Sequence, residues 1–120
     1  MTELYRVIEP EAFIECLGLF DNTTIAEIID IFMQEYPEKM KNIEESIHNA
    51  NTESVRFHAH SLKGVIANFG APQALLNIKL LEEYARNAPI TDCENQYKLF
   101  KPYGDQLIVE LSEIRKKLSV

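Results

Sequence analysis

The spacing of the apolar residues is the feature that most limits how this chain can fold. Apolar side chains recur about every 3.5 residues along nearly the whole sequence, which is the period of a helix rather than of a strand. The four glycines and five prolines that could interrupt helices are dispersed. We therefore expect an all-α protein without β-strands.

Start and stop signals in the first part of the chain predict one short helix and one long helix. The short helix should begin near Pro10, where the missing N–H of proline would be unpaired in any case, and end near Phe20. The pattern Thr24-Ile25-Ala26-Glu27 has the form of a capping box and predicts the start of the long helix. Pro37 lies inside this second helix and should kink it.

Three further helices should follow, each with an amphipathic apolar stripe. Their expected boundaries are Asn51 or Thr52 to Gly70, Pro72 to about residue 88, and Asp92 to Ser119, the last with Pro102 as a kink or a break. Long amphipathic helices with short connections pack against their neighbours. We therefore expect an antiparallel four-helix bundle with the short N-terminal helix capping one end.

Length and charge limit the domain organisation and the classes of partner. The 120 residues, of which 46% are hydrophobic, suit a single domain over residues 1–120. The net charge of −7 argues against nucleic acid, because binding to phosphate backbones depends on clustered Lys and Arg. No stretch approaches the ~18 consecutive apolar residues of a membrane span, and the N-terminus lacks a signal-peptide pattern. We expect a cytoplasmic monomer with a protein partner.

Motifs for metal-dependent, nucleotide-dependent and hydrolytic chemistry are missing from the sequence. Cys16 and Cys93 have no nearby cysteine, which supports neither a zinc site nor a disulfide framework and favours two buried thiols. His58 and His60 would point ~160° apart on a helix and cannot chelate one metal ion. There is also no G-x-S-x-G sequence and no P-loop. We expect no metal site and no ATP-dependent kinase activity.

Glu82 and Glu83 are adjacent acidic residues in the fourth predicted helix. Neighbouring side chains diverge by ~100° on a helix, so the two carboxylates cannot act as a pair. We interpret both as part of a solvent-exposed helix face.

His60 is the residue that most requires an explanation. The apolar stripe of the third helix passes through Val55, Ala59, Leu62, Ile66 and Phe69, and His60 falls ~140° from its centre. His60 should therefore face solvent, whereas His58 lies at the edge of the core and is expected to be a hydrogen-bonded structural residue. The residues expected around His60 are Arg56, Phe57, Lys63, Gly64 and Ala67.

Gly64 weakens the helix beside this histidine. A glycine in a helix interior costs about 1 kcal/mol relative to alanine, so some other property should offset the loss. On the exposed side, Gly64 and the small Ala67 would leave a flat surface that the backbone of another protein could approach closely. Lys63 adds a positive charge to this surface, where an anion could form. We infer a docking surface for a partner that delivers negative charge to an imidazole nitrogen.

The stretch His60-Ser61-Leu62-Lys63-Gly64, followed by Asn68-Phe69-Gly70-Ala71, closely resembles the signature of histidine-containing phosphotransfer (HPt) domains. Leu81-Glu82 with Ala85-Arg86 is also similar to the pattern of that family. The resemblance covers essentially the whole chain and implies a four-helix bundle with a short capping helix. Val65 and Ile66 depart from the small residues common after the glycine. Both side chains should point toward the core, so we expect altered packing of the helix rather than loss of the family's phosphotransfer chemistry.

The resemblance also implies residue roles. His60 would be the phosphoacceptor, Lys63 would steady the phosphoryl group, and Gly64 would let a receiver domain come close. The other residues expected in the docking surface are Arg56, Phe57, Ala67 and Asn68. Exposure of the ring tip favours Nε2 as the phosphorylated atom, although the sequence leaves both ring nitrogens open.

The expected function is therefore that of a phosphorelay intermediate. His60 would accept a phosphoryl group from a receiver-domain aspartate and pass it to another receiver aspartate. Response-regulator receiver domains or a hybrid sensor histidine kinase would be the partners, and the protein would need no cofactor of its own because the receiver's carboxylates would bring Mg²⁺. The alternative is a non-catalytic helical adaptor that binds a signalling protein and is never phosphorylated.

Overall fold

The computed structural model describes residues 6–120, and every regular element in that range is a helix. The all-α class is thus confirmed. No helix within the described range is both long and apolar enough to cross a membrane. The elements in chain order are α1 (Pro10–Leu17), α2 (Asn22–His48), α3 (Thr52–Ile66), the short 3₁₀ helix η2 (Ala67–Phe69), α4 (Pro72–Asn87) and α5 (Ile90–Lys117).

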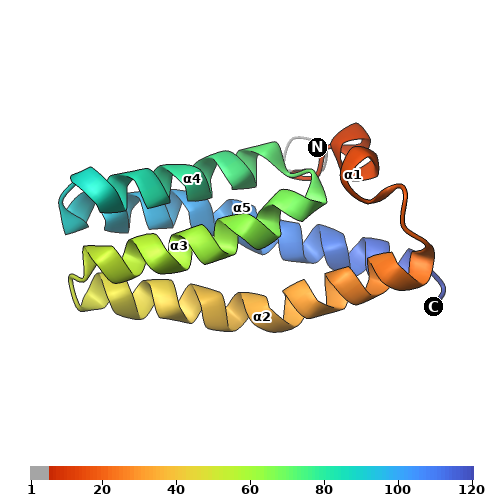
Figure 1. Cartoon of the computed structure of the whole chain (residues 1–120), viewed down its shortest axis with the longest axis horizontal. Coiled ribbons are helices and arrows are strands. Elements are labelled where there is room, and N and C mark those ends of the chain that lie inside the picture. The colour runs from red at the N-terminus through yellow and green to blue at the C-terminus, as the bar shows by residue number, and fades with distance from the viewer. Residues whose placement is uncertain (1–5) are drawn as a thin grey trace.

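The four long helices lie side by side, and each runs in the direction opposite to the one before it (Figure 1). α2 packs against α3, α3 against α4 and α4 against α5, and α5 in turn packs against α2. The short α1 lies at one end, where it contacts η2. The backbone N–H of Glu9 donates a hydrogen bond to the carbonyl oxygen of Gly70 at 2.8 Å, which ties the start of α1 to this end.

Two helix boundaries in the first part of the chain differ from the sequence prediction. α1 ends at Leu17 rather than near Phe20, because residues 18–20 turn toward α2. α2 begins at Asn22, where the Asp21 carboxylate accepts a hydrogen bond from the backbone N–H of Thr24 at 2.8 Å. The same hydrogen bond lowers the pKa of Asp21. The predicted capping box at Thr24 is therefore wrong, and Asp21 caps the helix instead.

The later boundaries follow the sequence signals more closely. Asn51 caps α3 by accepting a hydrogen bond from the backbone N–H of Ser54 at 3.0 Å. Gly70 has a φ of 65°, a left-handed conformation that suits glycine, and it ends the helical run after η2. α5 begins at Ile90 and continues through Pro102, so of the kink or break expected at that proline, the break does not occur.

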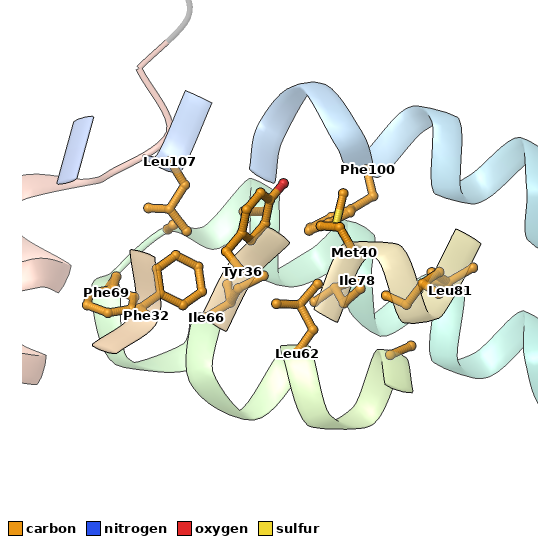
Figure 2. Close-up of a cluster of buried hydrophobic side chains, with 14 of the residues drawn as sticks. Phe32, Tyr36, Met40, Leu62, Ile66, Phe69, Ile78, Leu81, Phe100 and Leu107 are labelled. Atoms are coloured by element: carbon orange, nitrogen blue, oxygen red, sulfur yellow. The ribbon is translucent and has the colours of Figure 1, made fainter. Parts of the chain in front are cut away.

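The hydrophobic core fills the space between the four long helices (Figure 2). Each long helix contributes side chains to it, among them Tyr36 and Met40 from α2, Leu62 and Ile66 from α3, Ile78 and Leu81 from α4, and Phe100 and Leu107 from α5. Ile66 is fully buried and Val65 packs against the core, as their helix positions predict. The larger residues after Gly64 are thus accommodated inside the bundle.

The two cysteines lie in different environments. Cys93 is fully buried, as expected, but Cys16 is exposed, so the prediction of two buried thiols is wrong for Cys16. The reason is that the short α1 buries only Leu17 among its own residues. The Sγ atom of Cys16 lies 3.7 Å from the carbonyl oxygen of Ala67 in η2.

Candidate functional site

His60 lies on the outer face of α3, as its rotation from the core stripe predicts. Its side chain is 68% exposed. Two of its neighbours along the helix, Ala59 and Leu62, are fully buried. The helix is therefore anchored by its apolar face while the imidazole is presented to solvent.

A buried glutamate on α4 lies directly beneath this imidazole. The Oε2 atom of Glu82 is 2.9 Å from Nδ1 of His60, and its Oε1 atom is 2.7 Å from Nζ of Lys63. The Glu82 side chain is only 6% exposed, so the interpretation of this residue as part of a solvated face is wrong. Glu83 is exposed as expected. Helix packing between α3 and α4 thus joins His60 and Lys63 through a shared carboxylate.

The sequence did contain a signal for the burial of Glu82. This residue lies four positions after Ile78 and three before Ala85, both of which belong to the buried stripe of α4. It therefore falls within about 40–60° of that stripe on the helix. A carboxylate at the edge of a core stripe requires a partner, because burial of an unpaired charge is costly.

The charge state of Glu82 determines the role of Nδ1. Burial raises the pKa of this carboxyl, but hydrogen bonds from Lys63 and His60, together with their charges, outweigh burial and lower it below its usual value of 4.5. Glu82 is therefore ionised at neutral pH and can only accept hydrogen bonds. Nδ1 of His60 must then carry a proton, and in the neutral ring Nε2 carries a lone pair. No hydrogen bond to Nε2 is formed within residues 6–120.

Arg86 brings a second cation to the same carboxylate. Its Nη2 atom is 3.6 Å from Oε2 of Glu82, one helical turn away on α4. The Arg86 side chain is largely exposed, whereas that of Lys63 is mostly covered. Arg86 was not among the site residues predicted from the sequence, although the Ala85-Arg86 pair belongs to the pattern quoted there.

Comparison with protein-family models gives a match to the Hpt domain over residues 27–117. The matched region includes all of α3 and α4, and with them His60, Lys63 and Glu82. The chain belongs to the Hpt domain family. No curated protein and no solved structure matches it. Hpt domains are phosphocarrier modules of two-component signalling and are not kinases.

Gly64 occupies open space on the same face of this Hpt domain. A Cβ atom added at Gly64 would meet no atom of residues 6–120 within 4 Å, apart from its immediate neighbours and the nearby backbone of its own helix. The packing of the described chain therefore gives no reason for a glycine here. The other residues predicted for a docking surface, Arg56, Phe57, Ala67 and Asn68, are all exposed, the first two on α3 and the last two on η2.

His58 differs from its predicted role. The ring is half-buried, but no hydrogen bond to it is formed by residues 6–120, so the expected hydrogen bond is not found there. Instead, the ring of the exposed Phe57 meets it edge-on, with centroids 5.1 Å apart and an interplanar angle of 81°. His58 thus packs against the aromatic ring of Phe57 and does not take part in a polar network among the described residues.

Ser61 forms a contact that the sequence did not reveal. The Nζ atom of Lys39 on α2 donates a hydrogen bond to Oγ of Ser61 at 2.8 Å. The contact fixes α2 against α3 at the residue that follows His60. Within residues 6–120, no cluster of three or more His, Cys, Asp or Glu side chains is arranged to hold a metal ion.

Proposed function

We propose that this Hpt domain is an intermediate of a multistep phosphorelay. His60 accepts a phosphoryl group from a receiver-domain aspartate and passes it to an aspartate of another receiver. The observation that carries the proposal is the exposed imidazole whose Nδ1 atom is held by an ionised, buried glutamate. The acceptor is carried by a single domain over residues 1–120, an antiparallel four-helix bundle capped by α1.

The chemistry requires a neutral imidazole. The lone pair of Nε2 attacks the phosphorus of the partner's aspartyl phosphate. As the N–P bond forms, the P–O bond to the aspartate breaks and its electron pair returns to the carboxylate. The reverse step delivers the group to the second receiver. Phosphoryl transfer of this kind depends mainly on in-line placement and charge neutralisation, so one positioned nucleophile and few further groups suffice.

Lys63 supplies one of the positive charges. It lies one helical turn after His60 on α3, and its ammonium group is held at Oε1 of Glu82. From this position it steadies the phosphoryl group on the neighbouring ring. We expect the partner receiver domain to bind the Mg²⁺, since carboxylate oxygens are among the ligands that this ion prefers.

The docking surface consists of Arg56, Phe57, Gly64, Ala67 and Asn68, and Gly64 allows close approach. Its exposed aromatic ring and small residues suit a folded protein partner. We assign response-regulator receiver domains or a hybrid sensor histidine kinase as partners, rather than nucleic acid or membrane, and a monomeric cytoplasmic protein as the active form.

Transfer from a radiolabelled, phosphorylated receiver domain tests this function. Wild type should acquire acid-labile phosphate, His60→Gln should acquire none, and His58→Gln should be labelled like wild type. Failure to label wild type, or undiminished labelling of His60→Gln, would contradict the proposal. The adaptor alternative predicts that His60→Gln keeps both partner binding and signalling output.

A substitution at Gly64 tests the docking surface separately from the chemistry. Gly64→Gln should slow transfer from the receiver at least ~10-fold, because a long side chain would separate the two proteins at the point of closest approach. A small donor such as phosphoramidate needs no docking and should label this variant at the wild-type rate. Transfer from the receiver at the wild-type rate would show that close approach at Gly64 is not needed.

A further inference from the structure

Glu110 on α5 is a buried carboxylate that accepts hydrogen bonds from the opposite end of the chain. Its Oε2 atom accepts one from the backbone N–H of Val7 at 2.8 Å and one from Nε2 of Gln106 at 3.0 Å. Its Oε1 atom accepts one from the backbone N–H of Ile8 at 2.9 Å. Glu110 is only 5% exposed, and no cationic side chain within residues 6–120 pairs with it. Because burial of a carboxylate is costly, these three N–H groups are what stabilises it.

The two backbone hydrogen bonds fix the segment that precedes α1. Val7 and Ile8 belong to no helix, yet both are buried. A buried backbone N–H outside regular secondary structure needs an acceptor from elsewhere in the protein. Within residues 6–120, Glu110 is the group that supplies this acceptor to both. The carboxylate therefore attaches residues 7 and 8 to α5, across 103 and 102 positions of sequence.

The attached segment continues directly to η2 and α1. The next residue, Glu9, donates its backbone N–H to the carbonyl oxygen of Gly70 at 2.8 Å, and its carboxylate accepts a hydrogen bond from the backbone N–H of Ala12 at 2.7 Å. A Cβ atom at Gly70 would collide with the backbone of Ala12, so α1 lies directly against this glycine. η2, which Gly70 follows, carries Ala67 and Asn68 of the docking surface. The segment held by Glu110 thus ends against the part of the chain that presents these two residues.

We propose that Glu110 is a positioning residue for receiver docking, an inference that rests on the proposed function. It anchors residues 7 and 8, and these hold α1 against η2, so that Ala67 and Asn68 keep the arrangement that the receiver meets. No step of this chain of contacts involves His60. Loss of the carboxylate should therefore weaken docking and leave the reactivity of the imidazole unchanged.

Glu110→Gln tests the anchor with little change in side-chain shape. The amide has one oxygen acceptor in place of two, and its NH₂ group would face one of the N–H groups that the carboxylate now binds. A buried N–H without an acceptor is costly, so residues 7 and 8 should detach from α5 more often. Glu113→Gln is the matched control, because it makes the same change at an exposed position one turn further along α5.

The first test is hydrogen exchange of the backbone amides, followed by NMR. In wild type and Glu113→Gln, the amides of Val7 and Ile8 should be protected. In Glu110→Gln they should exchange at least ~10-fold faster, because the opening that exposes them becomes easier. Unprotected amides at these two positions in wild type, or unchanged exchange in a folded Glu110→Gln, would overturn the proposal. The wild-type measurement needs no substitution, so it tests the anchor even if the variant does not fold.

The second test separates docking from chemistry by the kinetics of phosphoryl transfer. With a phosphorylated receiver as donor, Glu110→Gln should raise the KM for the receiver about 5-fold and keep the wild-type rate at saturation, as expected for a residue that affects binding from a distance. Phosphoramidate, which needs no docking, should label the variant at the wild-type rate, and Glu113→Gln should match wild type with both donors.

Two kinetic results would overturn the proposal. One is an unchanged KM for the receiver in a Glu110→Gln variant whose residues 7 and 8 have lost protection. The other is an equal loss of rate with the receiver and with phosphoramidate, which would show a general structural defect. If wild type itself accepts no phosphoryl group, the proposed function fails, while the exchange measurement still shows whether Glu110 holds the start of the chain.

Discussion

Two glycines lie inside long helices of this protein, and their surroundings are opposite. A Cβ atom at Gly104 in α5 would lie 2.3 Å from Oη of Tyr36 and 2.9 Å from Cζ of Phe100. A Cβ atom at Gly64 in α3 would find open space among the described residues. The fold itself requires glycine at position 104, whereas the described residues give no reason for a glycine at position 64. The comparison separates a packing glycine, Gly104, from Gly64, the glycine that we propose serves docking.

The contact at Gly104 is fixed by a buried tyrosine. The hydroxyl of Tyr36 on α2 donates a hydrogen bond to Asp105 at 3.0 Å, and its ring packs against Phe32 with centroids 5.6 Å apart. Burial, and then the charge of Asp105 and the hydrogen bond to it, raise the pKa of Tyr36, so the hydroxyl stays protonated as a donor. The ring therefore cannot easily move aside to make room for a side chain on α5.

The largest effect is expected at the packing glycine. Gly104→Leu should lower the free energy of unfolding by about 3 kcal/mol, because overpacking a filled interface forces buried side chains out of their preferred positions. Urea denaturation followed by circular dichroism would measure it. Wild-type stability in this variant would mean that the α2–α5 interface is looser than the structure indicates, and the contrast between the glycines would be lost.

A smaller effect of opposite sign is expected at the docking glycine. Gly64→Ala should raise the free energy of unfolding by about 1 kcal/mol, because alanine favours the helix and its methyl group meets nothing. The same denaturation measurement applies, with Gly104→Ala as the matched control that should gain no stability. A destabilised Gly64→Ala would show that the fold needs this glycine after all.

The third prediction concerns Glu82, which joins His60 and Lys63 on α3 to α4. Because its folded-state pKa lies below the usual 4.5, its ionised form stabilises the protein above that pH, and this stabilisation is lost as the pH falls through the folded pKa. Wild type should therefore be more stable than Glu82→Gln at neutral pH, and the difference should shrink below about pH 4.5. Urea denaturation at several pH values measures it. A difference that stays constant into acid would mean that Glu82 is not ionised in the folded protein.

The sequence predicted the fold class and the exposed face of α3 because both depend on local spacing. The apolar period needs no knowledge of the partner helix, and the rotation of His60 from the core stripe follows from helix geometry alone. Helix caps are harder to predict from spacing, since Asp21 and Thr24 are both good capping residues and only the structure shows that Asp21 is used.

The carboxylate at the site was missed because it depends on how two helices meet. The angle between adjacent residues on a helix shows that Glu82 and Glu83 diverge, but not which of them faces α3. The contact with His60 joins residues 22 positions apart, and its formation requires the packing of α3 against α4. Spacing within one helix cannot supply this information, although the position of Glu82 beside the buried stripe of α4 could have suggested it.

The most direct test of the central claim is the position of the phosphoryl group itself. ¹⁵N-histidine-labelled protein, phosphorylated by a receiver domain and examined by NMR under alkaline conditions that preserve phosphohistidine, would identify the nitrogen bonded to phosphorus. We predict a single phosphoryl group on Nε2 of His60 and none on His48 or His58. A phosphoryl group on Nδ1 of His60, on another histidine, or on none of them would contradict the account.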